Sequence, residues 1–318
     1  MEEDRLTSRV NGKSYGIGCF ELVSLGTLRE RAKYGPRLPG RLRLGAMQAD
    51  VRALHRRPEF SGALFQVASQ FNMLEMVGPH ICPEDGVTRY EGDPTQGPAC
   101  AIAAGAATIY RNYFAAVGSQ VGQTSARQMD GLADLGDALS QRTGVPVSDL
   151  WQMRNGYALC TPDGLAKMTE CLTGLDEPNL DQLRGKLRIG IHRDVEVTDF
   201  GGEARPSVSQ AFCSALPVAY SGHRRAPWKA FATLVLEAAY EATLWEAVCN
   251  AQRGMSNIAL LTRVGGGAFG NDGAWIDTAM ERALRLAAGY DLDVRVVTQS
   301  GPSPGVLRMI EALQMPPG

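Results

Sequence analysis

The chain has 318 residues, and its 44% hydrophobic and 21% charged residues are typical of a globular protein and exclude a largely disordered one. The formal net charge at pH 7 is only −2, which argues against a protein that binds nucleic acid through its bulk charge. The longest apolar run, at 230–248, is interrupted by Glu237, Glu241 and Glu246, so we expect no membrane span and no membrane partner.

The start of the chain is acidic and polar and lacks the charged-then-apolar layout of a signal peptide. Seven scattered cysteines, of which no two form a C-x-x-C pair, are typical of free thiols in a reducing compartment. The histidines, His223 among them, have no metal-ligand spacing, and His80-x-Cys82 is a weak signal, so we predict no metal site. We therefore expect a cytoplasmic protein, and a monomer is the expected state.

The first quarter of the chain holds few regular elements. Residues 1–40 are rich in Gly, Arg and Pro, and we predict an N-terminal extension with one short helix around 21–33. A strand is expected within 41–54, and the apolar run at 63–71, bounded by turn formers, predicts a buried strand. Residues 78–98 contain many turn-forming residues and are predicted to be a loop.

Regular elements follow from residue 99 on. Apolar periodicity predicts helices at 99–114, 125–143 and 162–175 and strands at 186–197 and 208–220. The later elements are a helix at 228–252, a strand at 257–264, a glycine-rich loop at 265–273, a helix at 274–288, a strand at 292–299 and a helix at 303–313. This alternation predicts a three-layer α/β fold.

The glycine-rich loop is the first feature that could carry chemistry. It has four glycines in six positions, 265–270, between a predicted strand and a predicted helix. Glycines let backbone N–H groups approach an anion closely, which suggests a phosphate or pyrophosphate site; the alternative is a tight turn. Gly265, Gly267 and Gly270 also match the dinucleotide fingerprint, but only 48 residues follow Gly270 and no acidic residue ends the next strand, so this match is weak.

The second feature is an acidic loop between Asn72 and Gly97. Only Arg89 opposes its five carboxylates, which are Glu75, Glu84, Asp85, Glu91 and Asp93. Such a loop is either a solvated surface or a working site. It begins at the end of a predicted strand, as the glycine-rich loop does, and ligands of α/β sheets bind outside the carboxyl ends of strands. We therefore expect both loops to face the same crevice.

Three segments together resemble the macrodomain family, an α/β/α module with a mixed sheet that binds ADP-ribose. Ala49-Asp50-Val51 resembles the Gly-Asp-Ile step of that family, 65–72 resembles the strand that ends in an Asn, and Gly265–Asn271 resembles the diphosphate-binding loop. The sequence differs from common macrodomains in Ala49 for Gly and in Ser69-Gln70-Phe71-Asn72 for the Asn-Ala-Ala-Asn string. The resemblance implies a single catalytic domain over 41–318 with helices inserted around 115–185.

The runs FQVASQFNMLEM and PEDGVTRYEGDPTQGPACAIAAGAATIYRNYF resemble one branch of the family more closely. This branch contains the arginine-specific macrodomain ADP-ribosylhydrolases, typified by a Legionella effector that acts on ADP-ribosylated ubiquitin. The resemblance implies that acidic residues of the loop take part in hydrolysis. Asp85 and Asp93 match best, and Glu84 is a further catalytic candidate. An acidic loop would suit an arginine leaving group, because a carboxylate pairs well with a planar guanidinium.

The same resemblance implies a set of ADP-ribose-binding residues. Asp50, next to Val51, would accept a hydrogen bond from the adenine amino group, while Gln70 and Asn72 lie where the family faces the distal ribose. Thr95 would either cap the following helix or touch the ligand. The diphosphate would bind the loop residues Gly265, Gly266, Gly267, Ala268, Phe269, Gly270 and Asn271. Glu75, Glu84 and Glu91 are each expected to face solvent, although Glu75, three residues past the predicted strand, could instead point at the pocket.

The predicted function is therefore that of an ADP-ribosylhydrolase that cleaves ADP-ribose from modified arginine and needs no cofactor. Its partners would be ADP-ribose and the ADP-ribosylated protein. Two alternatives stay open. A reader module would bind ADP-ribose fully without cleaving any linkage, and an NAD-dependent oxidoreductase, the weaker alternative, would use Gly265–Gly270 to bind NAD(H) tightly.

Overall fold

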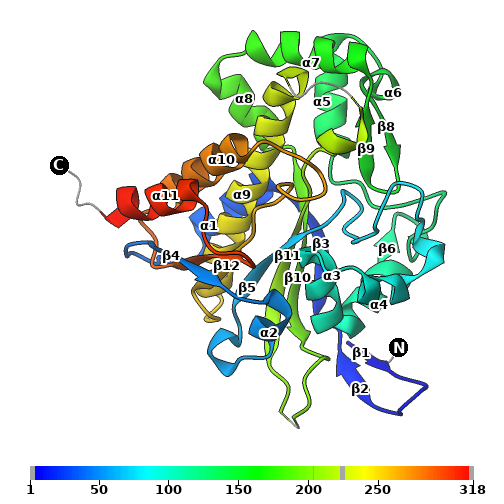
Figure 1. Cartoon of the computed structure of the whole chain (residues 1–318), viewed down its shortest axis with the longest axis vertical. Coiled ribbons are helices and arrows are strands. Elements are labelled where there is room, and N and C mark those ends of the chain that lie inside the picture. The colour runs from blue at the N-terminus through cyan, green and yellow to red at the C-terminus, as the bar shows by residue number, and fades with distance from the viewer. Residues whose placement is uncertain (1–3, 203, 223–225, 315–318) are drawn as a thin grey trace.

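The computed structural model describes residues 4–202, 204–222 and 226–314. Its centre is a seven-stranded mixed sheet (Figure 1). The strands, in their order across the sheet, are β3 (Cys19–Ser24), β10 (Arg188–Glu196), β11 (Ser207–Cys213), β5 (Leu64–Ala68), β12 (Ile258–Leu261), β13 (Asp293–Thr298) and β4 (Arg43–Gln48). The strands from β11 to β4 run parallel to one another, whereas β10 is antiparallel to both of its neighbours.

Helices cover both faces of the sheet, because the strands send alternate apolar side chains into two cores. Phe65 and Val67 of β5 pack into one core, and Leu64 packs into the other. The first core lies under α2 (Val51–His55), α3 (Gln96–Ala103) and α4 (Gly105–Tyr113), and the second under α1 (Leu25–Tyr34), α9 (Lys229–Gln252) and α10 (Gly273–Leu286). The last helix, α11 (Pro304–Gln314), packs beside β4. The predicted three-layer α/β/α arrangement is confirmed (Figure 1).

Most elements predicted after residue 186 are confirmed to within a few residues, but the helix predicted at 99–114 is two helices. The chain turns at Ala104, whose φ of −114° and ψ of 55° are not helical. The N–H of Gly105 donates to the hydroxyl of Thr198 at 2.7 Å, which holds the turn in place. Thr198 lies 93 residues after Gly105, so the apolar periodicity of 99–114 could not indicate this contact.

The segment between α4 and β10 forms an extension beyond the end of the sheet (Figure 1). It holds two hairpins, β6 (Ala116–Val117) with β7 (Gln120–Val121) and β8 (Trp151–Arg154) with β9 (Tyr157–Cys160). Its helices are α5 (Ala133–Thr143), α6 (Val147–Leu150), α7 (Pro162–Thr173) and α8 (Glu177–Arg184). The helix predicted from 125 begins only at Ala133, because the N–H of Gly131 bonds to the Phe71 carbonyl at 2.8 Å instead.

The segment predicted as an N-terminal extension contributes to the main fold from Cys19 on. A hairpin of β1 (Arg5–Thr7) and β2 (Ser14–Gly16) precedes β3, which is an edge strand of the central sheet. The helix expected around 21–33 is α1, which begins after the cap Ser24, and it buries Leu28 against α9. The strand is hard to recognise in the sequence because its central Glu21 is charged; it pairs with Arg31 and Arg193.

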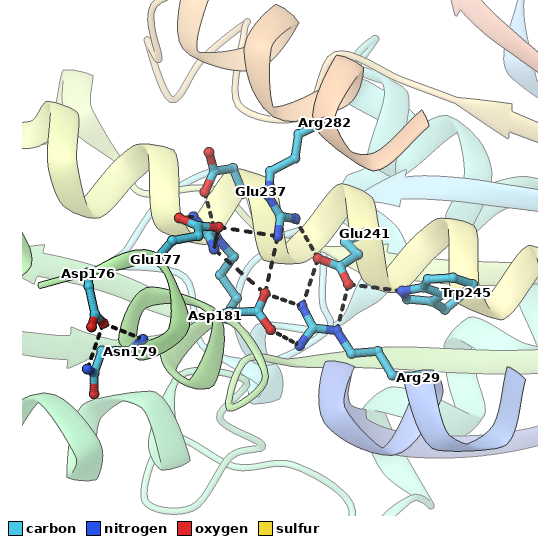
Figure 2. A network of polar contacts seen from close by, with 10 residues as sticks. Arg29, Asp176, Glu177, Asn179, Asp181, Glu237, Glu241, Trp245 and Arg282 are labelled. Carbon is cyan, nitrogen blue, oxygen red and sulfur yellow. Dashed lines mark hydrogen bonds and ion pairs between the residues drawn. The ribbon is translucent and has the colours of Figure 1, made fainter. Parts of the chain in front are cut away.

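The glutamates that interrupt the apolar run of α9 are paired with arginines inside the protein. The side chain of Glu241 is 3% exposed and binds Arg29 at 2.6 Å and Arg282 at 2.5 Å. Asp181 bridges the same two arginines, so one network joins α1, α8, α9 and α10 (Figure 2). The other two pairs are Glu237 with Arg184 and Glu246 with Arg193. Within the ranges that the structure describes, no helix has the length and apolar character needed to cross a membrane.

Candidate functional site

The segments singled out in the sequence gather at one edge of the sheet. The five parallel strands end there, and the chain continues from them into Asp50, Ser69, Ser214, Thr262 and Gln299. Hydrogen bonds tie these segments together along the edge. The side chain of Gln48 donates to the Gln299 carbonyl at 3.0 Å, and Asn271 donates to the Leu216 carbonyl at 2.8 Å. This carboxyl edge is the place where α/β sheets bind ligands.

The glycine-rich loop presents unpaired backbone donors at this edge. It is folded by tight turns, in which Gly270 N–H bonds to Gly267 O and Asn271 N–H bonds to Gly265 O, both at 3.0 Å. In the part of the chain that the structure describes, the N–H groups of Gly267, Ala268 and Phe269 have no hydrogen-bond partner. Three successive free donors in a loop between a strand and a helix suit the binding of an anion.

The helix that follows this loop does not add its own N-terminus to the anion site. Its N-cap Asp272 accepts a hydrogen bond from Ala274 N–H at 2.8 Å, so a carboxylate already occupies the end of α10. Arg263, at the start of the loop, pairs with Asp277 of α10 and donates to the Gly273 carbonyl at 3.2 Å. The loop therefore has free backbone donors of its own, whereas a carboxylate already caps the end of α10.

An aromatic cluster that the sequence did not reveal closes one side of the loop. The rings of Tyr157 and Tyr220 lie 5.2 and 5.7 Å from that of Phe269, and 5.2 Å from each other. Tyr157 comes from β9, and its hydroxyl donates to the Met76 carbonyl at 2.7 Å, so the cluster also anchors the acidic loop. Figure 1 shows the loop before α10 extending toward β9. The three aromatics are too far apart in sequence to form a motif.

The acidic loop folds into two short 3-10 turns, η2 (Pro83–Asp85) and η3 (Val87–Gly92), which divide its carboxylates. Asp85 is fully exposed, and hydrogen bonds from the backbone N–H and then the thiol of Cys82 hold its pKa below the usual range. Burial raises the pKa of Glu84, but hydrogen bonds from Ser125 outweigh it and leave that pKa lowered. Glu84 therefore faces Ser125, whereas Asp85 is held by Cys82.

Asp93 lies near the end of the acidic loop, where its Oδ1 accepts a hydrogen bond from Thr95 N–H at 2.9 Å. Burial raises the pKa of Tyr157, and Tyr220 and, to a smaller extent, Asp93 add to this rise. The carbonyl of Pro94 accepts from Gln299 at 3.5 Å, which places this end of the loop beside the end of β13. This end of the acidic loop therefore lies at the same edge of the sheet as the glycine-rich loop.

Glu75 does not face solvent, and the prediction that it would is wrong. Its carboxylate is buried and pairs with Arg111 of α4 at 2.8 Å, and neither side chain is exposed. Its backbone N–H donates to the hydroxyl of Tyr90 at 3.0 Å, which links the start of the loop to η3. Burial raises the pKa of Glu75 to about 7, although the Arg111 guanidinium lowers it in part. This buried ion pair ties the start of the acidic loop to α4.

The two carboxamides after β5 hold the loop backbone in this structure. Asn72 is fully buried; it accepts from Leu74 N–H at 3.1 Å and donates to Gln128 at 2.7 Å. Gln70 is 7% exposed and accepts from Met76 N–H at 2.7 Å. Both groups of the Asn72 carboxamide and the oxygen of the Gln70 carboxamide are therefore bound by protein partners, and the expected contact of these residues with the distal ribose stays a prediction.

The remaining candidates are helix-starting residues at the same edge. Asp50 is exposed and caps α2 by accepting from Arg52 N–H at 2.9 Å, while Val51 is buried in the core below. Thr95 occupies the N-cap position of α3 without a side-chain hydrogen bond, so its predicted capping role is wrong. Gln96, the first residue of α3, ties the helix to the sheet, because its carboxamide accepts from Ala68 N–H and donates to the Gln66 carbonyl of β5, both at 2.8 Å.

Gly265→Ala should destabilise the glycine-rich loop, and Gly267→Ala is its matched control. Gly265 has φ +76°, and a Cβ there would overlap the Cβ of Ala215, whereas a Cβ on Gly267 meets no atom within 4 Å. We expect Gly265→Ala to lower the free energy of unfolding by about 1–3 kcal/mol and Gly267→Ala to change it by less than about 0.5 kcal/mol. Urea denaturation measures both, and equal losses would contradict the geometry.

No protein-family model matches the chain, and no curated protein matches it. Solved structures of moderate similarity include poly(ADP-ribose) glycohydrolase from Deinococcus radiodurans in apo form, with 14% identity, a TM-score of 0.48, and 93% of this chain and 94% of that chain covered. The same enzyme in complex with ADP-ribose has 13% identity, a TM-score of 0.46, and 92% and 93% coverage. The enzyme from Thermomonospora curvata has 12% identity, a TM-score of 0.44, and 98% and 94% coverage. Because these TM-scores are below 0.5, the fold assignment rests on the sheet order and helix layers above.

Proposed function

We propose that this chain is an ADP-ribosylhydrolase that cleaves ADP-ribose from a modified protein side chain, with arginine as the favoured linkage. The observation that carries the proposal is the run of three unpaired backbone N–H groups at Gly267–Phe269. They lie at the carboxyl edge of a parallel sheet, the edge at which the acidic loop with Asp93 also ends. Donors in this position suit a diphosphate. The resemblance of the same segments to the macrodomain family supports ADP-ribose as the compound that contains it.

The other parts of the ligand would lie along the same edge. Asp50 uses one carboxylate oxygen to cap α2, and its exposed side chain retains a second oxygen to accept from the adenine amino group. The diphosphate would bind the glycine-rich loop, and the distal ribose would then lie beside the aromatic cluster of Tyr157, Tyr220 and Phe269. This order brings the anomeric carbon of the distal ribose toward Asp93.

The proposed reaction is the hydrolysis of an N-glycosidic bond. A water molecule attacks the anomeric carbon, the bond from this carbon to the guanidine nitrogen breaks, and the leaving nitrogen takes up a proton. Asp93 would accept the proton of the attacking water, which is the role of the base in glycoside hydrolysis. Asp85, an exposed carboxylate of the same loop, would hold the arginine guanidinium of the substrate. Glu84, which accepts hydrogen bonds from Ser125, stays a further catalytic candidate beside it.

Calorimetric titration with ADP-ribose tests the ligand and its place. We expect the wild type to bind and Asp50→Asn to bind about tenfold or more weakly, because asparagine keeps the helix cap but places an amide where the adenine amino group needs an acceptor. Glu59→Gln is the control, since Glu59 is an exposed acid whose side chain makes only a 3.8 Å pair with Arg57. No binding by the wild type would overturn the proposed ligand.

Release of ADP-ribose from an arginine-modified protein tests the catalytic part. We expect free ADP-ribose to accumulate with the wild type and not with a heat-denatured sample. If the protein binds ADP-ribose but releases it from neither arginine nor any other linkage, the chain is a reader module and not a hydrolase. Tight binding of NAD(H) that requires the nicotinamide would favour the oxidoreductase instead.

A further inference from the structure

A second site lies at the opposite edge of the sheet, where the parallel strands begin. An open cleft of about 540 Å³ separates the end of α1 from the turn before β13, and α9 forms its third side. Its lining includes Arg29, Lys33, Arg37, Gln252, Trp245 and Tyr290. The cleft is remote from the glycine-rich and acidic loops, since its turns lead into the amino ends of β4 and β13. Small-molecule sites have volumes of about 300–1,000 Å³, so this cleft has the size of such a site.

The floor of the cleft is held by paired charges. Arg29 donates to both Asp181 and Glu241 at 2.6–2.9 Å, so the acids beneath the cleft are already paired (Figure 2). The indole N–H of Trp245 donates to the same Glu241 at 2.9 Å, which sets the orientation of the ring (Figure 2). Gln252 ties the α1 end to the following turn by donating to the carbonyls of Ala32 and Pro36.

The walls and the rim of the cleft differ in character. Trp245 and Tyr290 form an edge-to-face pair with ring centres 5.6 Å apart, and both rings are partly exposed. Lys33 and Arg37 at the rim are exposed, and neither makes an ion pair with an acid in the described part of the chain; the Lys33 ammonium lies 5.0 Å from the Tyr34 ring. An aromatic wall below two free cations is complementary to a planar base that bears phosphate.

We infer that this cleft binds a nucleoside phosphate, with the base against Trp245 and Tyr290 and the phosphates on Lys33 and Arg37. The site is independent of the proposed hydrolase site, because it shares no residue with it and lies at the other end of the strands. An acidic peptide could also pair with Lys33 and Arg37. An extended peptide would leave the compact cleft and its aromatic pair unfilled. The observations therefore favour the small ligand.

Titration with ADP tests the inference. The test variant is the double substitution Lys33→Glu/Arg37→Glu, and the control is Lys167→Glu/Lys186→Glu, two exposed lysines elsewhere that change the net charge equally. We expect a binding step that weakens about tenfold or more in the test variant and persists in the control and in Asp50→Asn. A step that is lost only in Asp50→Asn, or lost equally in the control, would overturn the second site while leaving the proposed function intact.

Two further measurements test the base and the competing ligand. Bound ADP should quench part of the tryptophan fluorescence of the wild type. This quenching should be absent in Trp245→Phe, a variant that keeps an aromatic ring in the wall of the cleft. If inorganic pyrophosphate binds as tightly as ADP, the aromatic pair plays no part and the inference fails. Binding of a glutamate-rich peptide without any ADP binding at this cleft would also overturn it.

Discussion

Asp93→Asn should slow the release of ADP-ribose by about a hundredfold or more and change the affinity for free ADP-ribose only slightly. The asparagine can still accept the hydrogen bond from Thr95 N–H that Asp93 Oδ1 accepts at 2.9 Å, so the start of α3 is kept. It cannot take a proton from water at neutral pH, because an amide is not a base. Single-turnover release measures the rate, and calorimetry measures the affinity.

Two variants of the same loop are the controls for this effect. Asp85→Asn should cause a smaller loss, because its carboxylate is exposed and already accepts from Cys82. Glu91→Gln should change nothing, because Glu91 is exposed and has no hydrogen bond or ion pair in the described part of the chain. If Asp85→Asn and Asp93→Asn both retain full activity, the assignment of the catalytic carboxylates is wrong.

Glu75→Gln should lower the free energy of unfolding by about 3–5 kcal/mol, because it leaves the buried Arg111 guanidinium without its counter-charge. Neither side chain of the pair is exposed, and Arg111 cannot lose its proton. The Arg111 guanidinium also lies over the Phe212 ring at 3.7 Å, and one of its nitrogens has no hydrogen-bond partner. In the described part of the chain, Glu75 is the acid with which it forms an ion pair. Urea denaturation measures the loss.

Arg111→Met should cost less than Glu75→Gln, because an unpaired Glu75 can be neutralised by taking up a proton, whereas an unpaired arginine cannot. The double variant Glu75→Gln/Arg111→Met should recover much of the loss, since it removes both buried charges. Losses that simply add in the double variant would show that the ion pair is not what couples these two positions.

The sequence alone determined most of the local structure and the place of the candidate site. Periodicity sets the ends of α9, β12 and β13, because helices and strands repeat their apolar positions at fixed intervals. The glycine-rich loop between β12 and α10 was also recognisable, because a cluster of glycines marks a backbone that needs unusual φ angles. Gly265 and Gly270 do adopt positive φ. Since both loops follow parallel strands, their meeting at one edge could be expected from the topology.

Only the tertiary structure decided which polar residues face the candidate site and which support it. Glu75 is buried because Arg111, 36 residues later in the chain, supplies its counter-charge, and the aromatic cluster joins residues of β9, η4 (Val218–Tyr220) and the glycine-rich loop. In the same way, β3 belongs to the sheet because Arg193 of the neighbouring β10 pairs with its charged Glu21. Such partners are distant along the chain and have no period, so their effect on burial and charge exists only once the chain is folded.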